Sequence, residues 1–188
     1  MGTLAFLAEA LRYPAAGRLE TLHSGLVRLP DGPAKRGLED FIQRIEKLSL
    51  AEWEELFTHT LDLSPTIAPY VGYQMWSDSY KRGSFMAKIN REMQELGIEK
   101  DGDLPDHLVP ILRYLDATAE LGITPIAELV EVFEPAVQKM RKGLRKTEPD
   151  NPYVYLLEAV LRAAELEEWK VGRLEEWSRG RGTRTTDG

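Results

Sequence analysis

The sequence contains no cysteine and only three histidines, His23, His59 and His107, among its 188 residues. The absence of cysteine excludes disulfides, thiolate zinc sites, iron–sulfur ligation and a cysteine nucleophile. Three histidines that lie far apart in the sequence argue against a histidine metal cage. We therefore expect a protein that holds no metal ion and no cofactor.

Long apolar runs are also missing. No run approaches the ~20 residues that a membrane-spanning helix needs, and Met1-Gly2-Thr3-Leu4 lacks the basic region of a secretory signal. These absences predict a cytoplasmic protein that does not insert into the membrane. The charge is acidic, because 31 Asp and Glu face 24 Lys and Arg for a formal net charge of −7. This excess argues against a nucleic-acid binder, which carries a basic surface, and it suits a basic partner.

Motifs that mark common enzyme classes are absent as well. The sequence has no phosphate-binding loop of the Gly-x-x-x-x-Gly-Lys-Ser/Thr type, no Gly-x-Gly-x-x-Gly, no His-Glu-x-x-His and no Gly-x-Ser-x-Gly. Adjacent carboxylates such as Glu54-Glu55 fall on polar faces of expected helices, where solvated side chains are the ordinary interpretation. We therefore expect that the protein is not an enzyme.

Helical periodicity is the dominant pattern that is present. Apolar residues recur at spacings of three and four, as in Leu38, Phe41, Ile42 and Ile45, and no alternating strand pattern stands out. The pattern predicts an all-α fold, a single-domain bundle of eight or more helices over residues 1–177. Residues 178–188 combine Gly, Arg and Thr with no apolar side chain, a composition typical of a disordered tail.

Several residues predict where helices begin or end. Ser49 and Glu52 have the spacing of a capping box, Gly97 suits the left-handed position after a helix, and Asn151-Pro152 opens the last long helix. We also predict that Ser77 or Asp78 caps the helix that follows it. Pro105 is expected at the first helical position of the next helix.

Two segments have an unusual composition. Residues 63–83 hold four aromatic residues, two prolines and two glycines, which suits either a concave surface or a packed corner between helices. The second segment is Asp103-Leu104-Pro105-Asp106-His107-Leu108. Here we expect Asp106 in the first helical turn, opposite the positive end of the helix dipole. His107 is expected to hydrogen-bond a loop or to titrate near neutral pH.

These two segments resemble the signatures of a known family. The first carries Tyr70-Val71-Gly72-Tyr73, Asp78-Ser79-Tyr80-Lys81-Arg82-Gly83 and Met86, after Leu63-Ser64-Pro65. The second carries Leu104-Pro105-Asp106-His107-Leu108, followed by Leu112, Tyr114 and Leu115. In this order they are similar to the NarJ family, and the related TorD and DmsD chaperones have an Asp-His pair at the matching place. The resemblance covers residues 50–118.

The resemblance implies a TorD-like helical fold and a chaperone for a molybdenum enzyme. Such a chaperone binds the apo catalytic subunit, often through its N-terminal peptide, and assists insertion of the molybdenum cofactor. Nitrate reductase is the first expectation for this client. The chaperone would act as a monomer or a homodimer, in the cytoplasm and without nucleic acid.

A physical mechanism accompanies this implication. A basic, helical client segment would lay its apolar face into a groove and offer Arg or Lys to carboxylates. Arg82 would either meet the client or brace the groove by pairing with Asp106 or Asp78. The expected client-binding residues are Tyr70, Tyr73, Trp76, Asp78, Arg82, Phe85, Met86, Asp103, Asp106, His107 and Tyr114.

One alternative uses the same aromatic residues differently. A small-molecule-binding all-α regulatory protein would enclose a ligand in an apolar cavity with little groove at the surface. An enzyme such as a metal-dependent hydrolase would need a cluster of His, Asp and Glu, which three scattered histidines do not favour.

Overall fold

The computed structural model describes residues 2–65 and 67–165, and within them it contains nine α-helices, one π-helical turn and no strand. The predicted all-α fold with at least eight helices is therefore confirmed. The expected tail, residues 178–188, lies outside the described residues. The elements are α1 Thr3–Ala10, α2 Arg18–Leu26, α3 Pro33–Ile45, α4 Leu50–Phe57, η1 Thr58–Asp62, α5 Val71–Trp76, α6 Tyr80–Glu95, α7 Leu108–Leu121, α8 Ala127–Thr147 and α9 Pro152–Glu165.

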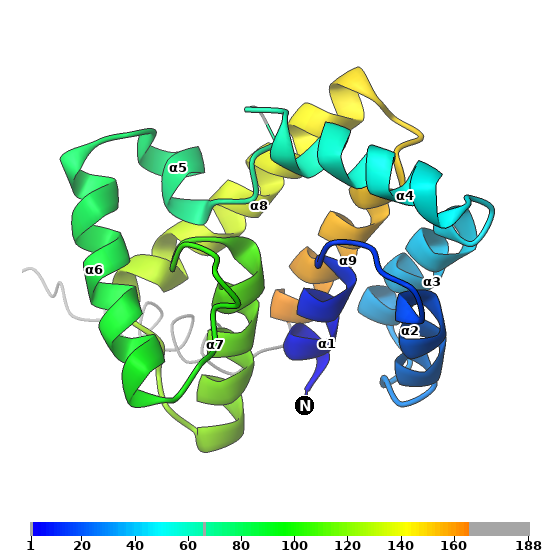
Figure 1. Cartoon of the computed structure of the whole chain (residues 1–188). Helices are drawn as coiled ribbons and strands as arrows, with labels where there is room; N and C mark the ends of the chain where they lie inside the picture. Colours follow the sequence, from blue (N-terminus) through cyan, green and yellow to red (C-terminus); the bar gives the residue numbers. More distant parts are fainter. Residues whose placement is uncertain (1, 66, 166–188) are drawn as a thin grey trace, which may run out of the picture.

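The helix α9 connects much of the bundle. It packs against α3, α8 and α1, while α1 also packs against α7. The short helix α5 contacts both α8 and α6. Figure 1 shows α5, α6 and α7 at the left of the molecule and α2, α3 and α4 at the right, with α1 and α9 between them and α8 running from one side to the other.

Buried aromatic side chains join α3, α4 and α9. The rings of Phe41 and Tyr153 lie 5.3 Å apart between their centroids, and the Trp53 indole Nε1 donates a hydrogen bond of 3.1 Å to the Tyr153 hydroxyl. The buried polar atoms of this cluster are thus paired with each other, as burial in an apolar core requires. The cluster anchors one half of the bundle.

A buried carboxylate attaches α1 to α7. Asp116, on α7, accepts hydrogen bonds from the backbone N–H groups of Gly2 at 2.8 Å and Ala5 at 3.1 Å. These groups lie at the N-terminal end of α1, where backbone donors have no partner within the helix. A side chain 111 positions away therefore supplies the cap.

Three of the predicted helix ends are confirmed. Ser49 and Glu52 form the reciprocal capping box at the start of α4, and Gly97 has a φ of +66° after α6. The Asn151 side chain accepts a hydrogen bond of 3.0 Å from the backbone N–H of Tyr153 at the start of α9. In each case the interaction is local, which is why the sequence reveals it.

Two predicted helix starts are wrong. The cap of α6 is Ser79, whose hydroxyl accepts a hydrogen bond of 3.5 Å from the Arg82 N–H, whereas the predicted Ser77 ends α5. The helix α7 begins at Leu108 with His107 as its cap, so Pro105 does not occupy its first position. The cause lies in Asp106, whose backbone and side chain are both bound to the segment 71–82.

In the part of the chain that the structure describes, no helix has the length and the apolar character needed to cross a membrane.

Candidate functional site

The two unusual segments of the sequence meet in space. Tyr70 and His107 form an isolated antiparallel bridge. On either side of it, Val71 N–H donates to the Asp106 carbonyl at 2.8 Å and Leu108 N–H donates to the Pro69 carbonyl at 2.7 Å. These bonds fix the start of α5 against the start of α7. We call this region the junction, defined by Tyr70, Gly72, Tyr73, Asp78, Arg82, Asp106 and His107.

An ion pair lies at the centre of the junction. Arg82 Nε donates to Asp106 Oδ2 at 2.7 Å and its Nη2 donates to Oδ1 at 3.3 Å, so the contact is bidentate. The Arg82 side chain is 11% exposed and the Asp106 side chain is 0% exposed. The pair therefore joins α6 to the segment before α7 from inside the protein.

A second carboxylate binds the same guanidinium from the solvent side. Asp78 Oδ1 accepts a hydrogen bond of 2.7 Å from Arg82 Nη1, and the Asp78 side chain is 82% exposed. Burial lowers the pKa of Arg82, but the hydrogen bonds and negative charges of Asp106 and Asp78 outweigh burial and raise it. Arg82 is thus a permanent cation shared by one buried and one exposed acid.

Aromatic rings surround the cation. The Arg82 Cζ atom lies 5.5 Å from the ring centroid of Tyr70 and 5.4 Å from that of Tyr73, within the range of a cation–π contact. The Tyr70 ring also meets the His107 ring edge-on, with centroids 5.1 Å apart. Both tyrosines are half-buried, so they form the wall between the ion pair and solvent.

Gly72 allows this close packing. A Cβ atom at this position would lie 2.7 Å from Asp106 Oδ2, 3.1 Å from Arg82 Cγ and 3.2 Å from Phe85 Cδ1. Only a residue without a side chain lets α5 approach the ion pair so closely. Gly72 belongs to the segment Tyr70-Val71-Gly72-Tyr73 that carries the resemblance. Its structural role depends on the contact with Asp106, and the sequence does not reveal that contact.

His107 is neutral at the junction. Burial lowers its pKa from 6.5 to about 4, more than the negative charge of Asp106 raises it. Its Nδ1 accepts a hydrogen bond of 3.3 Å from the backbone N–H of Val109, so the proton is assigned to Nε2. Asp103 Oδ2 also lies 3.3 Å from Nδ1, but a neutral ring makes no ion pair there. The His107 side chain therefore caps its own helix α7 and makes no hydrogen bond to a loop in the part of the chain that the structure describes, and its lowered pKa lies below the neutral range expected from the sequence.

Acidic side chains lie beside Tyr70. The pKa of Asp103 is raised by burial and by the charge of Asp101, and the pKa of Asp62 is raised by burial and by the charge of Asp103. Burial and the charges of Asp103, Asp106 and Asp62 also raise the pKa of Tyr70. An added positive charge would relieve the repulsion among these groups. Sequence reasoning missed Asp62, which ends the π-helical turn, because such turns have no simple sequence pattern.

The loop that carries Asp103 is attached to α1 and α7. Arg113 donates to the Glu99 carbonyl at 3.0 Å, to Asp101 Oδ2 at 2.8 Å and to Glu9 Oε1 at 2.9 Å. One arginine of α7 thus holds the loop against the N-terminal helix. This network fixes the loop next to the junction.

Three of the expected client-binding residues are buried. Phe85, Asp106 and Tyr114 each have 0% exposure, so a partner cannot touch their side chains in this conformation. Phe85 packs against Trp76, with ring centroids 5.3 Å apart. The Tyr114 hydroxyl donates to Glu92 at 3.5 Å and accepts from the Ile126 N–H at 3.3 Å, away from the junction. These three assignments are corrected: Phe85 and Tyr114 belong to the core, and Asp106 is an internal partner of Arg82.

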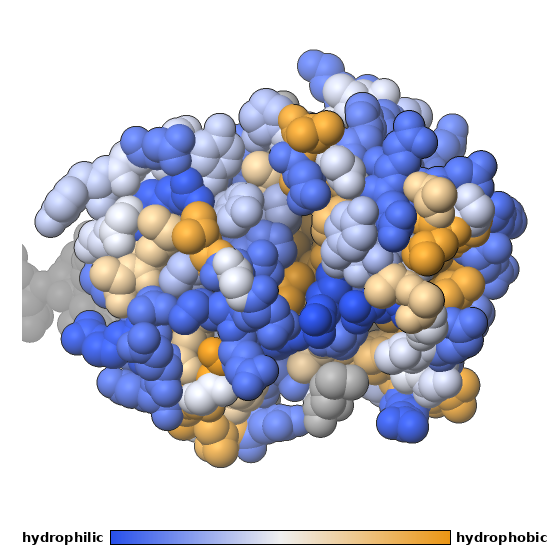
Figure 2. All heavy atoms as spheres, viewed as in Figure 1, coloured by the Kyte–Doolittle hydropathy of each residue, from blue (hydrophilic) through white to orange (hydrophobic). Residues whose placement is uncertain are grey.

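The other expected residues remain within reach of solvent. Asp78 is exposed, Arg82 and His107 are mostly buried, and the half-buried residues are Tyr70, Tyr73, Trp76, Met86 and Asp103. The Lys81 ammonium lies 4.8 Å from the Trp76 ring centroid, so this ring has a cation over it. Figure 2 shows the face seen in Figure 1 as mostly hydrophilic with separate hydrophobic patches, and hollowed near its centre.

Among the described residues, no group of three or more His, Cys, Asp or Glu is arranged to hold a metal ion. No family model and no curated protein matches this sequence. The junction combines two half-buried tyrosine rings, a fixed cation and the exposed carboxylate of Asp78.

Proposed function

We propose that the protein is a maturation chaperone for a molybdenum enzyme, with nitrate reductase as the first candidate client. It binds a basic N-terminal segment of the apo catalytic subunit in the cytoplasm, as a monomer or homodimer, and assists cofactor insertion without catalysing a covalent step. The resemblance of residues 50–118 to the NarJ family is the origin of this proposal.

One observation carries it. The two segments that bear the resemblance are far apart in the sequence, yet Arg82 and Asp106, 24 positions apart, join them in a buried ion pair. A chance likeness of two short motifs gives no reason for them to form one structural unit. Their meeting supports the view that both serve the same binding surface.

The surface next to the junction suits a basic, amphipathic segment. Asp62, Asp78 and Asp103 supply carboxylates, and the exposed side chains of Leu63 and Leu104, 72% and 47% exposed, supply apolar area. A client helix with Arg or Lys beside an apolar stripe matches both features. Charge-assisted hydrogen bonds to exposed carboxylates would then select basic clients.

The test is calorimetric titration of the full chain with a synthetic peptide of the first residues of the nitrate reductase catalytic subunit from the same genome. We expect a saturable interaction whose affinity falls as salt rises, because screening weakens contacts between exposed charges. The matched control is the same peptide with its Arg and Lys residues changed to Gln, which should bind much more weakly.

Failure of both peptides to bind would reject the peptide-binding mechanism. Equal binding of the two peptides would reject the role of the carboxylates. The biological part of the proposal is tested by deleting the gene and measuring molybdenum in purified nitrate reductase. Unchanged molybdenum content in the deletion strain would exclude this client.

A further inference from the structure

The C-terminal part of α8 is strongly basic and lies apart from the junction. Residues 139–146 contain five of the 24 Lys and Arg residues of the chain and no Asp or Glu, although the formal net charge of the sequence is −7. Figure 1 shows this end of α8 at the top of the molecule, whereas α6, which carries Arg82, lies at the left. The local charge is therefore opposite in sign to the charge of the whole chain.

Two of the five cations hold α8 in place. Lys139 Nζ donates a hydrogen bond of 2.7 Å to the Gln74 carbonyl on α5, and Arg141 forms an ion pair with Glu158 on α9. The other three cations are exposed and make no hydrogen bond or ion pair within residues 2–65 and 67–165. We call these three side chains the basic face: Lys142, Arg145 and Lys146.

Helical geometry turns the basic face toward solvent. Arg145 and Lys146 follow Lys142 at the i+3 and i+4 positions, which are neighbours on the surface of an α-helix. Met140 and Leu144 each lie two positions from Lys142, which at about 100° per residue places them on the opposite side of the helix. They are 0% and 1% exposed. The apolar side of α8 thus lies in the core, and the basic side is accessible.

The basic face departs from the charge pattern of the other helices. Elsewhere in the described residues, several Lys and Arg side chains pair with an acid four positions earlier: Asp31–Lys35, Asp40–Arg44, Asp78–Arg82 and Glu158–Arg162. The residues four positions before Arg145 and Lys146 are instead Arg and Lys. Like charges at this spacing destabilise a helix. The helix dipole favours Arg145 and Lys146 in the last turn, but Lys142 precedes that turn.

Neighbouring acids do not neutralise this charge. Burial lowers the pKa of Arg141, and the positive charges of Arg145 and Arg162 lower it further, so the cations repel one another. The carboxylates of Glu158 and Glu165 on α9 pair with Arg162. A negative charge from outside the chain would therefore relieve the repulsion on this side of α8.

We propose that the basic face binds an acidic helix of a partner protein, in which Glu or Asp recurs at spacings of three and four residues. Carboxylates at these spacings lie along one side of the partner helix, so they reach all three cations together. A membrane is a less suitable partner, because helices that bind membranes expose apolar side chains beside their cations, and Met140 and Leu144 are buried.

Nucleic acid is also a less suitable partner. Duplex DNA carries one negative charge per ~1.7 Å along its whole length. Three cations neutralise few of these charges, and the remaining phosphates would face a protein whose net charge is −7. A short acidic helix confines its negative charge to the area of the basic face.

The test is calorimetric titration of the full chain with a synthetic alanine-based helical peptide that carries Glu at alternating spacings of three and four residues. We expect saturable binding that weakens as the salt concentration rises. The control peptide has the same composition, with its Glu residues distributed around the helix. It should bind at least about threefold more weakly, because only some of its carboxylates can reach the basic face at one time.

The basic face is tested by Lys142→Gln with Arg145→Gln and Lys146→Gln. This triple variant should bind the acidic peptide at least about tenfold more weakly, since three exposed ion pairs are lost. The matched control changes three exposed cations on or near α2 and α3: Arg28→Gln with Arg36→Gln and Lys47→Gln. It changes the net charge equally and should alter the affinity by less than about twofold. Circular dichroism verifies that both variants fold.

Three outcomes would overturn the proposal. They are a failure of the acidic peptide to bind, equal binding of the two peptides, and equal losses of affinity in the two triple variants. Tighter binding to vesicles of phosphatidylserine and phosphatidylcholine, or to a DNA duplex, would also reject the acidic helix as the partner. The result does not depend on whether the junction binds an enzyme client, because no junction residue is changed.

Discussion

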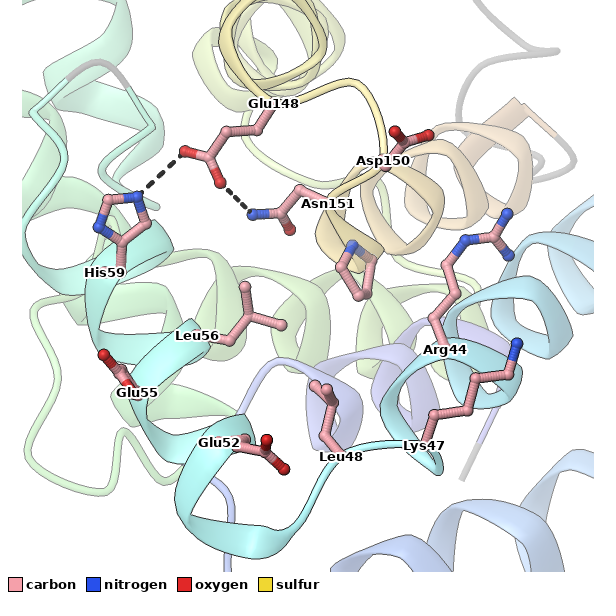
Figure 3. Close-up of a pocket in the computed structure, with 11 residues that line it drawn as sticks. Arg44, Lys47, Leu48, Glu52, Glu55, Leu56, His59, Glu148, Asp150 and Asn151 are labelled. Atoms are coloured by element: carbon pink, nitrogen blue, oxygen red, sulfur yellow. Dashed lines mark hydrogen bonds and ion pairs between the residues drawn. The ribbon is translucent and has the colours of Figure 1, made fainter.

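The junction and the open pocket lined by α3, α4 and the connection from α8 to α9, drawn in Figure 3, differ in how deeply their charged side chains are buried. At the junction, Asp106 is inaccessible and its partner Arg82 is 11% exposed, whereas at the pocket the His59–Glu148 contact has side chains 66% and 39% exposed. A buried charge depends on its partner, because water cannot replace it. An exposed charge loses little when its partner leaves. Burial therefore separates charges that hold the fold from charges that are available to other molecules.

The largest effect should come from breaking the buried pair. Asp106→Asn leaves the Arg82 guanidinium with only the exposed Asp78 as a charged partner, and we expect a loss of about 3 kcal/mol in the free energy of unfolding. The measurement is urea denaturation monitored by circular dichroism. The comparison variant at the pocket, Glu148→Gln, should lose less than about 1 kcal/mol. Similar losses in the two variants would contradict the distinction by burial.

The next effect concerns pH. Folding lowers the pKa of His107 from 6.5 to about 4, so between these values the unfolded chain binds a proton that the folded protein does not. Stability from this group is therefore complete above about pH 6.5 and is lost as the pH falls toward 4, by about 3 kcal/mol in total. Asp62 and Asp103, whose pKa values folding raises, act in the opposite direction.

The His107 contribution is isolated by comparing variants across this pH range. His107→Gln should flatten the fall in the free energy of unfolding between pH 6.5 and pH 4, while Gln still offers an acceptor to the Val109 N–H. His59→Gln, at the exposed rim of the pocket, should leave the slope nearly as it is in the unaltered protein. If His107→Gln keeps the full slope, then His107 is not the group responsible.

Gly72 and Gly83 differ in the space that is available for an added Cβ atom. Gly72→Ala places a Cβ 2.7 Å from Asp106 Oδ2, and we expect a loss of about 1–3 kcal/mol in the free energy of unfolding. Gly83, in α6, has no such neighbour within 4 Å. Gly83→Ala should therefore stabilise the protein by about 0.5–1 kcal/mol, since alanine favours the helix. Thermal unfolding of both variants checks the opposite signs, and the same sign in both would contradict the role of Gly72.

The predictable part of this structure is the part set by local interactions. Ser49 caps α4 through Glu52, three residues later, and Gly97 ends α6 by its own conformational freedom. Phe85, Ile89 and Met93 recur at helical spacing on α6 and are all buried, so the periodicity favours an inward orientation of Phe85, whereas its assignment to a binding surface is wrong. For Phe85, the helical periodicity is therefore a better guide to burial than the resemblance to a family motif.

The unpredictable part is set by distant contacts. Asp106 has the position of a helix-dipole partner in the sequence, but Arg82, 24 positions earlier, binds its carboxylate and keeps the helix from starting. Both partners of this ion pair lie against Gly72, which is also too far from Asp106 in the sequence for a local pattern to reveal the contact. Asp62 was missed because the helical pattern does not distinguish a π-helical turn from the end of α4.

Substitution of Asp78 should have the smallest effect on stability and the most specific effect on binding of the client peptide. Because its side chain is 82% exposed and Arg82 retains Asp106, Asp78→Asn should change the free energy of unfolding by less than about 0.5 kcal/mol. If the proposed function is correct, the same variant should weaken binding of the basic client peptide by about two- to fivefold, since one exposed ion pair is lost.

The matched control is Asp150→Asn, which removes an exposed carboxylate at the pocket and should leave peptide affinity unchanged in calorimetric titration. If both variants weaken the peptide equally, its attraction is to the net charge of −7 and not to the junction. If Asp78→Asn instead destabilises the fold as much as Asp106→Asn does, exposure does not separate the two acids of Arg82. A loss of affinity in Asp78→Asn alone would show that the peptide contacts the exposed carboxylate bound to Arg82. The buried carboxylate of Asp106 would then serve to hold Arg82 in place.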